Sequence, residues 1–317
     1  MSLALLFSPQ GSQAVGMGRE LAERSGAARA TFAEADATLG WSVSGTCWEG
    51  PADRLDDTRQ TQPCLLTTSV AAHRALGEQV ELEPALVAGH SVGEYAALVA
   101  AGVLDFPAAL RLVARRAELM AAVDAVGGMS AVLGLDRETV ETVIAGVGRP
   151  TDLVMANDNA PGQVIISGRL EALEGAEEQM RAAGAKRILR LPVSGAFHSP
   201  LMAEVVERLA AAFDAEEWHD ARVPVISNVS AEPLTEAGRI RALLGEQVRS
   251  PVEWVRSVER MAADGIDLAV ECGPGGTLTG MVKRIAPGMR TANVADAASL
   301  DATVELMRAG VPAPASA

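Results

Sequence analysis

The chain is poor in cysteine, in aromatic side chains and in histidine. Three cysteines, Cys47, Cys64 and Cys272, occur in 317 residues, an odd number at wide spacing. This pattern argues against a disulfide framework and predicts buried thiols in a reducing, cytoplasmic setting. Aromatic residues make up 3% of the chain, and four histidines are the whole supply of imidazole bases. Any histidine-dependent chemistry must come from one of these four.

Basic residues are also in the minority. The 27 Lys and Arg residues stand against 41 Asp and Glu residues, which leaves a net charge of −14. Such a surface repels phosphate backbones, so we expect no nucleic-acid partner. No apolar run reaches the length of a membrane span, and the first residues lack a basic segment followed by an apolar one. We therefore expect neither a membrane partner nor a signal peptide.

Motifs for a bound nucleotide cofactor are missing as well. The turn Gly273-Pro274-Gly275-Gly276, between a predicted strand and a predicted helix, is rich enough in glycine to cradle a phosphate. It lacks the Lys-Ser/Thr pair of a P-loop and the G-x-G-x-x-G of a dinucleotide site. We expect no cofactor and no metal.

What the chain has in quantity is alanine, valine and leucine. These dominate the 49% of residues that are apolar, a composition typical of helices packed on a parallel sheet. The length allows one large domain and a smaller one. We expect an α/β fold whose large domain takes residues 1–126 and 194–310, with a small domain at 127–193 inserted into it. Residues 311–317 are rich in Pro and Ala and are predicted to be a frayed tail.

The inserted segment has an order of its own. Apolar patterns between residues 127 and 193 alternate as strand, helix, strand, strand, helix, strand. This β-α-β-β-α-β order is that of the split βαβ, ferredoxin-like unit. We therefore predict a second, separate sheet in this part of the chain.

One stretch carries the strongest chemical signal. The apolar run 85–88 is followed by Gly-His-Ser-Val-Gly at 89–93 and then by the helical composition of 94–101. A strand, a tight turn and a helix around G-x-S-x-G form a nucleophile elbow, in which Ser91 stands at the apex. The alternative is a chance match, with Ser91 acting only as a helix N-cap. The flanking pattern favours the catalytic interpretation.

A serine nucleophile needs a base within hydrogen-bond reach. His198 lies in the loop 192–200, and the order serine then histidine matches elbow enzymes. His90 adjoins the serine, but neighbouring side chains on a sharp turn point apart; the alternative for His198 is a structural hydrogen bond. No acid follows a large-domain strand between Ser91 and His198, which favours a dyad whose imidazole is held by a backbone carbonyl.

Several motifs together resemble one family. They are the Gly-His-Ser-Val-Gly-Glu-Tyr segment, an early Gln-Gly-Ser-Gln, Thr61-Gln62-Pro63, Ala196-Phe197-His198-Ser199 and Gly273-Pro274-Gly275. In this order they resemble the malonyl-CoA:acyl carrier protein transacylase family over nearly the whole chain. The resemblance implies an α/β-hydrolase-like large domain with a ferredoxin-like small one. It also implies transfer of a malonyl group from malonyl-CoA to the phosphopantetheine thiol of an acyl carrier protein.

The resemblance implies a role for each matching residue. Ser91 would form the malonyl-serine and His198 would carry the proton. The backbone N–H groups of Gln10 and Val92 would form the oxyanion hole, and Arg116 would pair with the malonate carboxylate. A solvated helix face is the alternative for Arg116, which neighbours Arg115.

Two further positions follow from the same resemblance. The backbone carbonyl of Gln247 would hold the His198 ring. Phe197 stands in the form that related polyketide acyltransferase domains use for malonyl units, and its bulk would crowd an α-methyl branch. One departure lies in the first loop, where Phe7-Ser8-Pro9-Gln10 replaces the usual Phe-Pro-Gly-Gln.

The implied partners are malonyl-CoA and an acyl carrier protein. Carrier proteins are acidic, so docking needs a local basic patch; the candidates are Lys186, Arg187, Arg190, Lys283 and Arg284. Three rivals remain: a serine esterase or thioesterase on the same elbow, a related acyltransferase for another acyl-CoA, and a binding module without activity. A long-lived acyl-enzyme would count against the hydrolase, and labelling of Ser91 by a serine-directed probe would exclude the binding module.

Overall fold

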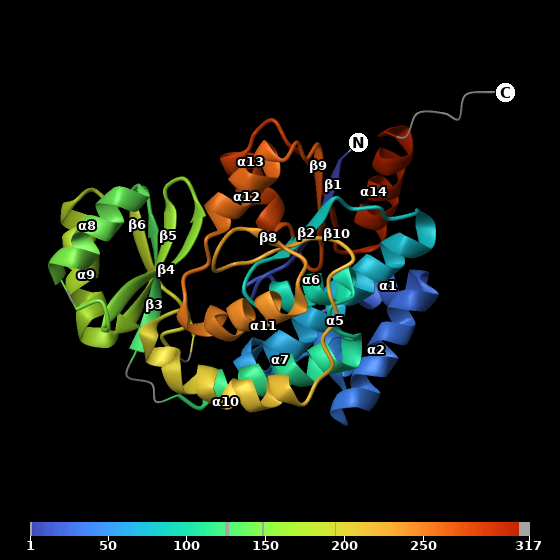
Figure 1. Cartoon of the computed structure of the whole chain (residues 1–317), viewed down its shortest axis with the longest axis horizontal. Helices are drawn as coiled ribbons and strands as arrows, with labels where there is room; N and C mark the ends of the chain where they lie inside the picture. The colour runs from blue at the N-terminus through green and yellow to red at the C-terminus, as the bar shows by residue number, and fades with distance from the viewer. Residues whose placement is uncertain (1, 124–126, 148, 194, 311–317) are drawn as a thin grey trace.

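A computed structural model describes residues 2–123, 127–147, 149–193 and 195–310 (Figure 1). The expected tail at 311–317 lies outside the described residues, as do residues 124–126 and 194 at the two expected domain junctions. The structure contains a larger, mostly parallel sheet and a separate antiparallel sheet. A mixed α/β fold with these two sheets is thereby established.

The larger sheet has six strands in the order β10-β9-β1-β2-β7-β8. Neighbouring strands from β10 to β7 run parallel, and β8 is antiparallel to β7. Their bounds are β1 Leu3–Phe7, β2 Leu86–Gly89, β7 Val225–Ile226, β8 Pro233–Leu234, β9 Leu268–Cys272 and β10 Arg290–Val294. Because β1, β2, β7 and β9 are parallel, the loops that follow them meet at one edge of the sheet, where α/β proteins bind ligands.

Helices cover both faces of this sheet. Leu5 and Phe7 of the central strand pack into the larger apolar core, and Leu6 packs into a second core on the opposite face. Full burial of a side chain such as leucine contributes roughly 1.5–3 kcal/mol, so the apolar run of β1 stabilises both layers. The first core is covered mainly by α1 Arg19–Arg24, α2 Gly26–Leu39, α3 Val43–Glu49, α5 Thr58–Gln79, α6 Gly93–Ala101, α7 Phe106–Ala121 and α14 Ala297–Gly310. The second core is covered by α12 Trp254–Ala263 and α13 Thr277–Ile285.

The remaining elements of the large unit connect these layers. They are α4 Ala52–Asp56, α10 Ala203–Asp214, α11 Ala237–Glu246 and two short 3₁₀ helices, η1 Pro200–Met202 and η2 Gln247–Arg249. In the described part of the chain, no helix is long and apolar enough to cross a membrane. The same residues contain no cluster of three or more metal-ligating side chains.

The second sheet has four antiparallel strands in the order β4-β5-β3-β6. Its elements are β3 Gly127–Leu133, α8 Arg137–Val147, β4 Leu153–Ala160, β5 Gln163–Arg169, α9 Leu170–Ala182 and β6 Arg187–Arg190. A third apolar core lies between this sheet and its two helices, with Leu173, Met180 and Val140 facing strand residues such as Ile166. The smaller unit therefore has its own core.

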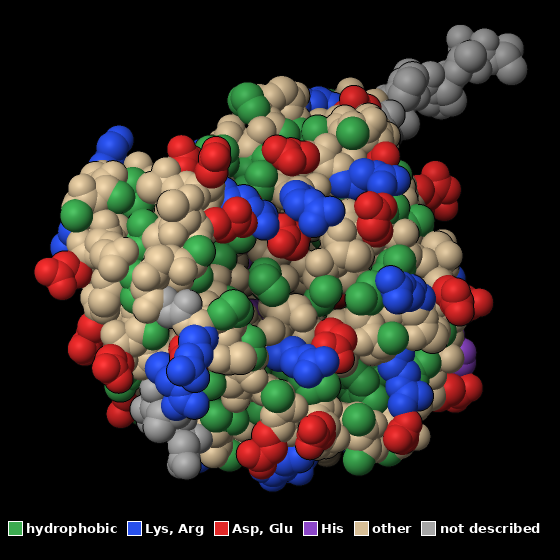
Figure 2. Space-filling model, turned by 60° about the vertical axis from the view of Figure 1, so that its left-hand side comes forward, with side chains coloured by type: hydrophobic (Ala, Val, Ile, Leu, Met, Phe, Trp, Pro, Cys, Tyr) green, Lys and Arg blue, Asp and Glu red, His purple; other side chains and the backbone are tan. Residues whose placement is uncertain are grey.

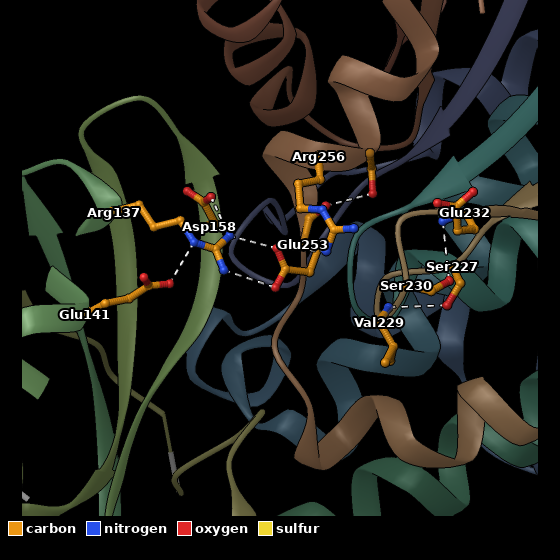
Figure 3. Close-up of polar contacts among 10 residues, drawn as sticks. Arg137, Glu141, Asp158, Ser227, Val229, Ser230, Glu232, Glu253 and Arg256 are labelled. Atoms are coloured by element: carbon orange, nitrogen blue, oxygen red, sulfur yellow. Dashed lines mark hydrogen bonds and ion pairs between the residues drawn. The ribbon is translucent and has the colours of Figure 1, made fainter. Parts of the chain in front are cut away.

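Backbone and ionic contacts tie β4 to the large unit. The Val252 N–H donates to the Ala156 carbonyl at 2.8 Å, and the Asp158 N–H donates to the Val252 carbonyl at 3.1 Å. Arg137, at the start of α8, reaches across this seam to Asp158 at 3.1 Å and to Glu253 at 2.8 Å (Figure 3). The polar end of β4 is thereby fixed against the larger sheet.

Two local features go beyond what the sequence analysis expects. Thr61-Gln62-Pro63, one of the motifs of the resemblance, lies inside a helix, since α5 begins at Thr58 and runs through Pro63. Pro63 is the sixth residue of α5, so it removes one helical hydrogen bond, and burial of the surrounding residues 61–72 in the core compensates for that loss. Strand β10 and helix α14 were not anticipated, because Arg290–Val294 is a partly exposed edge strand without a long apolar run.

Candidate active site

Ser91 stands at a turn that only glycine-flanked backbone can form. Its φ is +53°, in the left-handed region that non-glycine residues rarely adopt. A Cβ on Gly89 would lie 2.0 Å from the backbone of Gly93, and a Cβ on Gly93 would lie 2.2 Å from the Phe7 carbonyl oxygen. The two glycines thus let β2 and α6 approach β1 closely enough to hold the serine in this strained conformation.

His198 reaches the serine from the loop before η1. Its Nε2 lies 2.8 Å from Ser91 Oγ. On the other side of the ring, Nδ1 lies 2.9 Å from the carbonyl oxygen of Gln247 and 3.2 Å from that of Ser250. Carbonyls only accept, so Nδ1 carries the proton and Nε2 is free to accept from the serine hydroxyl. Burial, and second to it the Arg116 charge, lower the pKa of His198 to about 3, which keeps the imidazole neutral.

Arg116 is a buried cation beside the nucleophile. The side chain is 1% exposed. Its guanidinium donates to the Gln62 side-chain oxygen at 2.5 Å, to that of Gln247 at 3.1 Å and to Ser91 Oγ at 3.2 Å. Among the residues that the structure describes, no carboxylate is hydrogen-bonded to it. A buried guanidinium held by neutral oxygens is a site for an anion.

Glu94 is an acid whose charge acts on Arg116, and the two side chains meet only through Gln247. Glu94 is 3% exposed, and its Oε2 accepts from the Gln247 Nε2 at 2.5 Å. The Gln247 amide therefore lies between the carboxyl of Glu94 and the guanidinium of Arg116. Burial raises the pKa of Glu94 to about 7, against the lowering effect of the Gln247 hydrogen bond.

The expected oxyanion-hole residues flank the nucleophile. Val92 caps α6 directly after Ser91, and Gln10 follows β1, which is hydrogen-bonded to β2. Within the described ranges, the backbone N–H of neither residue has a hydrogen-bond partner. The Gln10 side chain is engaged elsewhere, with Nε2 donating to Thr58 Oγ1 at 3.2 Å. Two free N–H groups beside a serine hydroxyl suit a developing negative charge.

A cavity of about 340 Å³ opens over the serine. Its walls come from both units, and the side of the molecule where they meet is seen in Figure 2. Phe197 lines it beside His198, and Met120 of α7 lines it one helical turn beyond Arg116. The remaining wall includes Pro9, Gln10, Met129, Asn157, Asn159, Ile165, Leu191, Pro192, Val193, Thr277 and Met281. The cavity is mostly apolar, and its lining also includes one acid, Asp56, whose carboxylate accepts from the Gln13 side chain at 2.9 Å.

Four polar residues of the site were missed at the sequence level: Gln62, Glu94, Asn159 and Asn228. Asn159 lies at the end of β4, and its Oδ1 is 2.7 Å from His90 Nε2. Burial lowers the pKa of His90 to about 4, so this imidazole is neutral as well. The polar run Asn157-Asp158-Asn159 at the end of an apolar strand was a usable signal. Gln62 and Glu94 lie within two of the motifs that carry the family resemblance, but the sequence assigns them no role, because each acts through a contact distant in sequence; Asn228 gives no signal at all.

The candidate basic residues lie outside the cavity wall, and two are already engaged. Arg190 pairs with Glu177 at 2.9 Å. Arg284 donates to the side chain of Gln163 and to the Pro161 carbonyl, at the turn between β4 and β5. Lys186, Arg187 and Lys283 are exposed. Basic side chains on the face in Figure 2 stand among acidic ones.

Comparison with known proteins gives a consistent result. A family model described as acyl transferase domain matches residues 4–305. The malonyl CoA-acyl carrier protein transacylase of Bacillus subtilis is 43% identical over 309 residues, which covers 96% of this chain and 97% of that protein. The protein of the same name from Escherichia coli K12 is 41% identical over 305 residues, 96% of this chain and 99% of that one.

Solved structures agree. An acyl carrier protein S-malonyltransferase from Vibrio cholerae superposes with a TM-score of 0.92 at 41% identity, covering 96% of this chain and all of that one (100%). A malonyl-transacylase in complex with its type II PKS acyl-carrier protein superposes with a TM-score of 0.93 at 40% identity, with coverage of 96% and 100%.

Proposed function

The chain belongs to the acyl transferase family of the malonyl CoA-acyl carrier protein transacylases, and we propose that it transfers a malonyl group from malonyl-CoA to the phosphopantetheine thiol of an acyl carrier protein. One observation carries the choice of acyl group. The buried guanidinium of Arg116, which only neutral oxygens accept from within the described residues, lies 3.2 Å from the hydroxyl of Ser91. A cation at that distance places a carboxylate within one short acyl chain of the nucleophile.

The first half-reaction forms an ester on Ser91. The serine Oγ attacks the thioester carbonyl of malonyl-CoA while His198 Nε2 takes the hydroxyl proton. The tetrahedral intermediate then collapses: the C–S bond breaks, and the imidazolium returns its proton to the departing CoA thiol. The neutral imidazole, with its Nδ1–H held by the Gln247 carbonyl at 2.9 Å, is oriented for both transfers.

The backbone N–H groups of Gln10 and Val92 hold the oxyanion of that intermediate. Gln10 lies in the turn three residues after β1, and Val92 is the N-cap of α6, so each is positioned by an adjoining element. Helix N-terminal N–H groups also carry the positive end of the helix dipole. Removing one such donor typically slows an acyl transfer by about 10²–10³-fold.

Arg116 binds the free carboxylate of the malonyl group. Its fork of N–H donors suits a planar carboxylate, and an acetyl group would leave the buried cation without an anion. Phe197 lines the cavity next to the reacting groups, so its ring crowds an α-methyl branch. These two residues account for selection of malonyl over acetyl and methylmalonyl units.

The second half-reaction is the reverse with a new thiol. The phosphopantetheine thiol gives its proton to His198 and attacks the malonyl-serine, the C–Oγ bond breaks, and the proton returns to Ser91. In the described part of the chain, carbonyl oxygens and no carboxylate hold Nδ1 of His198, which favours transfer over the esterase alternative. Malonyl-CoA is a substrate here, and the scheme uses no cofactor.

The strand order extends the proposal to the two units. The order β4-β5-β3-β6 supports a ferredoxin-like small domain at 127–193, inserted into an α/β-hydrolase-like large domain of residues 1–126 and 194–310. The turn at Ser91 is then its nucleophile elbow.

Three free, buried cysteines support a reducing, cytoplasmic location. The product suits fatty-acid or polyketide synthesis, both of which use malonyl carrier proteins.

Mass spectrometry of the intact protein tests this function. Mixing with malonyl-CoA should add one malonyl group, and adding an acyl carrier protein should remove it and place it on the carrier. Ser91→Ala should stay unmodified, whereas Ser44→Ala, whose hydroxyl donates to Asp36 away from the cavity, should behave like the wild type. Loss of the malonyl group to water at the same rate with and without carrier would instead support a hydrolase.

A further inference from the structure

Arg116 and His198 contact the same oxygen. The guanidinium NH2 donates to Ser91 Oγ at 3.2 Å, and His198 Nε2 lies 2.8 Å from that oxygen. Both side chains are buried, with exposures of 1% and 4%. Little water separates the permanent positive charge from the imidazole, so the charge acts on it with weak screening. The base must become positive during the reaction, directly beside a positive group.

The other titratable groups near Arg116 and His198 offset that charge only in part. The turn after β2 contributes His90, which is neutral, and α6 contributes, beside Arg116, Tyr95, whose pKa is raised by burial so that it stays protonated. Helix α6 also contributes Glu94, which acts on Arg116 across the Gln247 amide, and burial raises its pKa to about 7 so that it is mostly protonated below neutral pH. The segment from η2 contributes only the carbonyls of Gln247 and Ser250.

We propose that Arg116 restrains the Ser91–His198 pair electrostatically, and that the carboxylate of a bound malonyl group releases this restraint. The inference rests on the proposed function, because it takes malonyl-CoA as the substrate. When no anion neutralises Arg116, its positive charge disfavours the imidazolium that forms on His198 as Ser91 loses its proton. An acyl carboxylate on the guanidinium cancels the repulsion, and an acetyl group leaves it in place.

The consequence is selectivity in rate as well as in binding. A carboxylate that only anchored the substrate would lower KM for malonyl-CoA relative to acetyl-CoA. A carboxylate that also frees the base raises the acylation rate constant at saturation, because the imidazolium is stabilised at the moment it forms. Arg116 is then both the recognition residue for the acyl group and the regulator of the base.

Substrate binding to Ser91→Ala provides a direct test. This variant has no nucleophile, so malonyl-CoA and acetyl-CoA can be held at saturation while the imidazole signals are titrated by NMR. The chain has four histidines, so His198 is readily assigned. Saturating malonyl-CoA should raise the midpoint of His198 by about one pH unit or more, and acetyl-CoA should not. Equal midpoints in the two complexes would overturn the proposal.

Charge variants of Arg116 give a second, ligand-free measurement. In Arg116→Met and Arg116→Gln the His198 midpoint should rise by about one unit, whereas Arg116→Lys should keep it low. If Arg116 is only structural, all three variants should have a lower Tm and an unchanged His198 midpoint. That result would contradict the proposal. The two failures are distinguishable. A wild type that is not malonylated on Ser91 refutes the proposed function, whereas a malonylated wild type with an unresponsive His198 refutes only this inference.

Discussion

Asn228 holds the backbone that leads from β2 into the Ser91 apex. Its side-chain oxygen accepts from the Ser91 N–H at 2.6 Å, and its Nδ2 donates to the Gly89 carbonyl at 2.6 Å. Asn228 follows β7, the parallel neighbour of β2, so the clamp comes from a rigid element. One amide thus satisfies two backbone groups at a turn whose φ is strained.

Removing this clamp should slow acylation. We expect Asn228→Ala to reduce the rate of Ser91 malonylation roughly 10²-fold, because a small displacement of a positioned nucleophile has an effect of that order. Stopped-flow or quenched-flow measurement of malonyl-enzyme formation provides the rate. Asn293→Ala is the matched control, since that amide also donates to a glycine carbonyl, that of Gly275, outside the elbow. Equal rates in the two variants would contradict a positioning role.

Arg116→Ala should reverse the acyl preference. We expect malonyl transfer to fall by about 10²–10³-fold and acetyl transfer to be retained or to rise, because the buried cation that penalises a neutral acyl group is gone. Competition between malonyl-CoA and acetyl-CoA measures the preference. Arg115→Ala is the control, since Arg115 is half exposed and pairs with Glu118 at 3.2 Å. Unchanged malonyl selectivity in Arg116→Ala would remove this residue from the mechanism.

The elbow could be located from sequence because its signal is local. A strand, two glycines around the serine, and a helix lie within a short stretch, and His198 was one of only four histidines. Choosing Arg116 over Arg115 required the family resemblance, since composition alone does not tell which face of α7 is buried. Glu94 and Gln62 lie within the family motifs, but what their side chains do was out of reach of such reasoning. Their partners, Gln247 and Arg116, come from other elements and meet them only once the chain has folded.

Carrier-protein docking should depend on the exposed cations at and beside the turn between β4 and β5. Lys186 and Arg284 both lie by the turn between β4 and β5. Arg284 donates to the Pro161 carbonyl in that turn. Lys186 packs against Gly134, whose N–H donates to the Gly162 carbonyl of the same turn. We expect Lys186→Glu or Lys283→Glu to raise KM for the carrier about tenfold, with weaker effects at high salt, because rim charges act mainly on encounter.

The control for docking lies at the opposite edge of the larger sheet. Arg290 begins β10 and so lies at the amino ends of the parallel strands, whereas Ser91 follows the carboxyl end of β2. Arg290→Glu should therefore leave the carrier KM unchanged. None of these variants should alter acylation by malonyl-CoA alone. A carrier KM that responds equally to Lys283→Glu and Arg290→Glu would place docking elsewhere.

Glu94 should make the free energy of unfolding fall as pH rises towards neutrality. Burial raises the pKa of Glu94 from 4.5 to about 7, so between these values the folded chain keeps a proton that the unfolded chain releases. The contribution of Glu94 to the free energy of unfolding is complete below about pH 4.5, falls as the pH rises from there to about 7, and no longer changes above about pH 7. The contribution lost between these two pH values amounts to roughly 3 kcal/mol. Glu94→Gln should lack this slope in urea unfolding at pH 5, 6, 7 and 8, whereas Glu138→Gln, an exposed first-turn acid of α8, should retain it.

The buried histidines contribute the opposite slope equally to both proteins, so the informative quantity is the difference between variant and wild type. A difference that stays flat across this range would mean that Glu94 is ionised in the folded protein and compensates Arg116 directly.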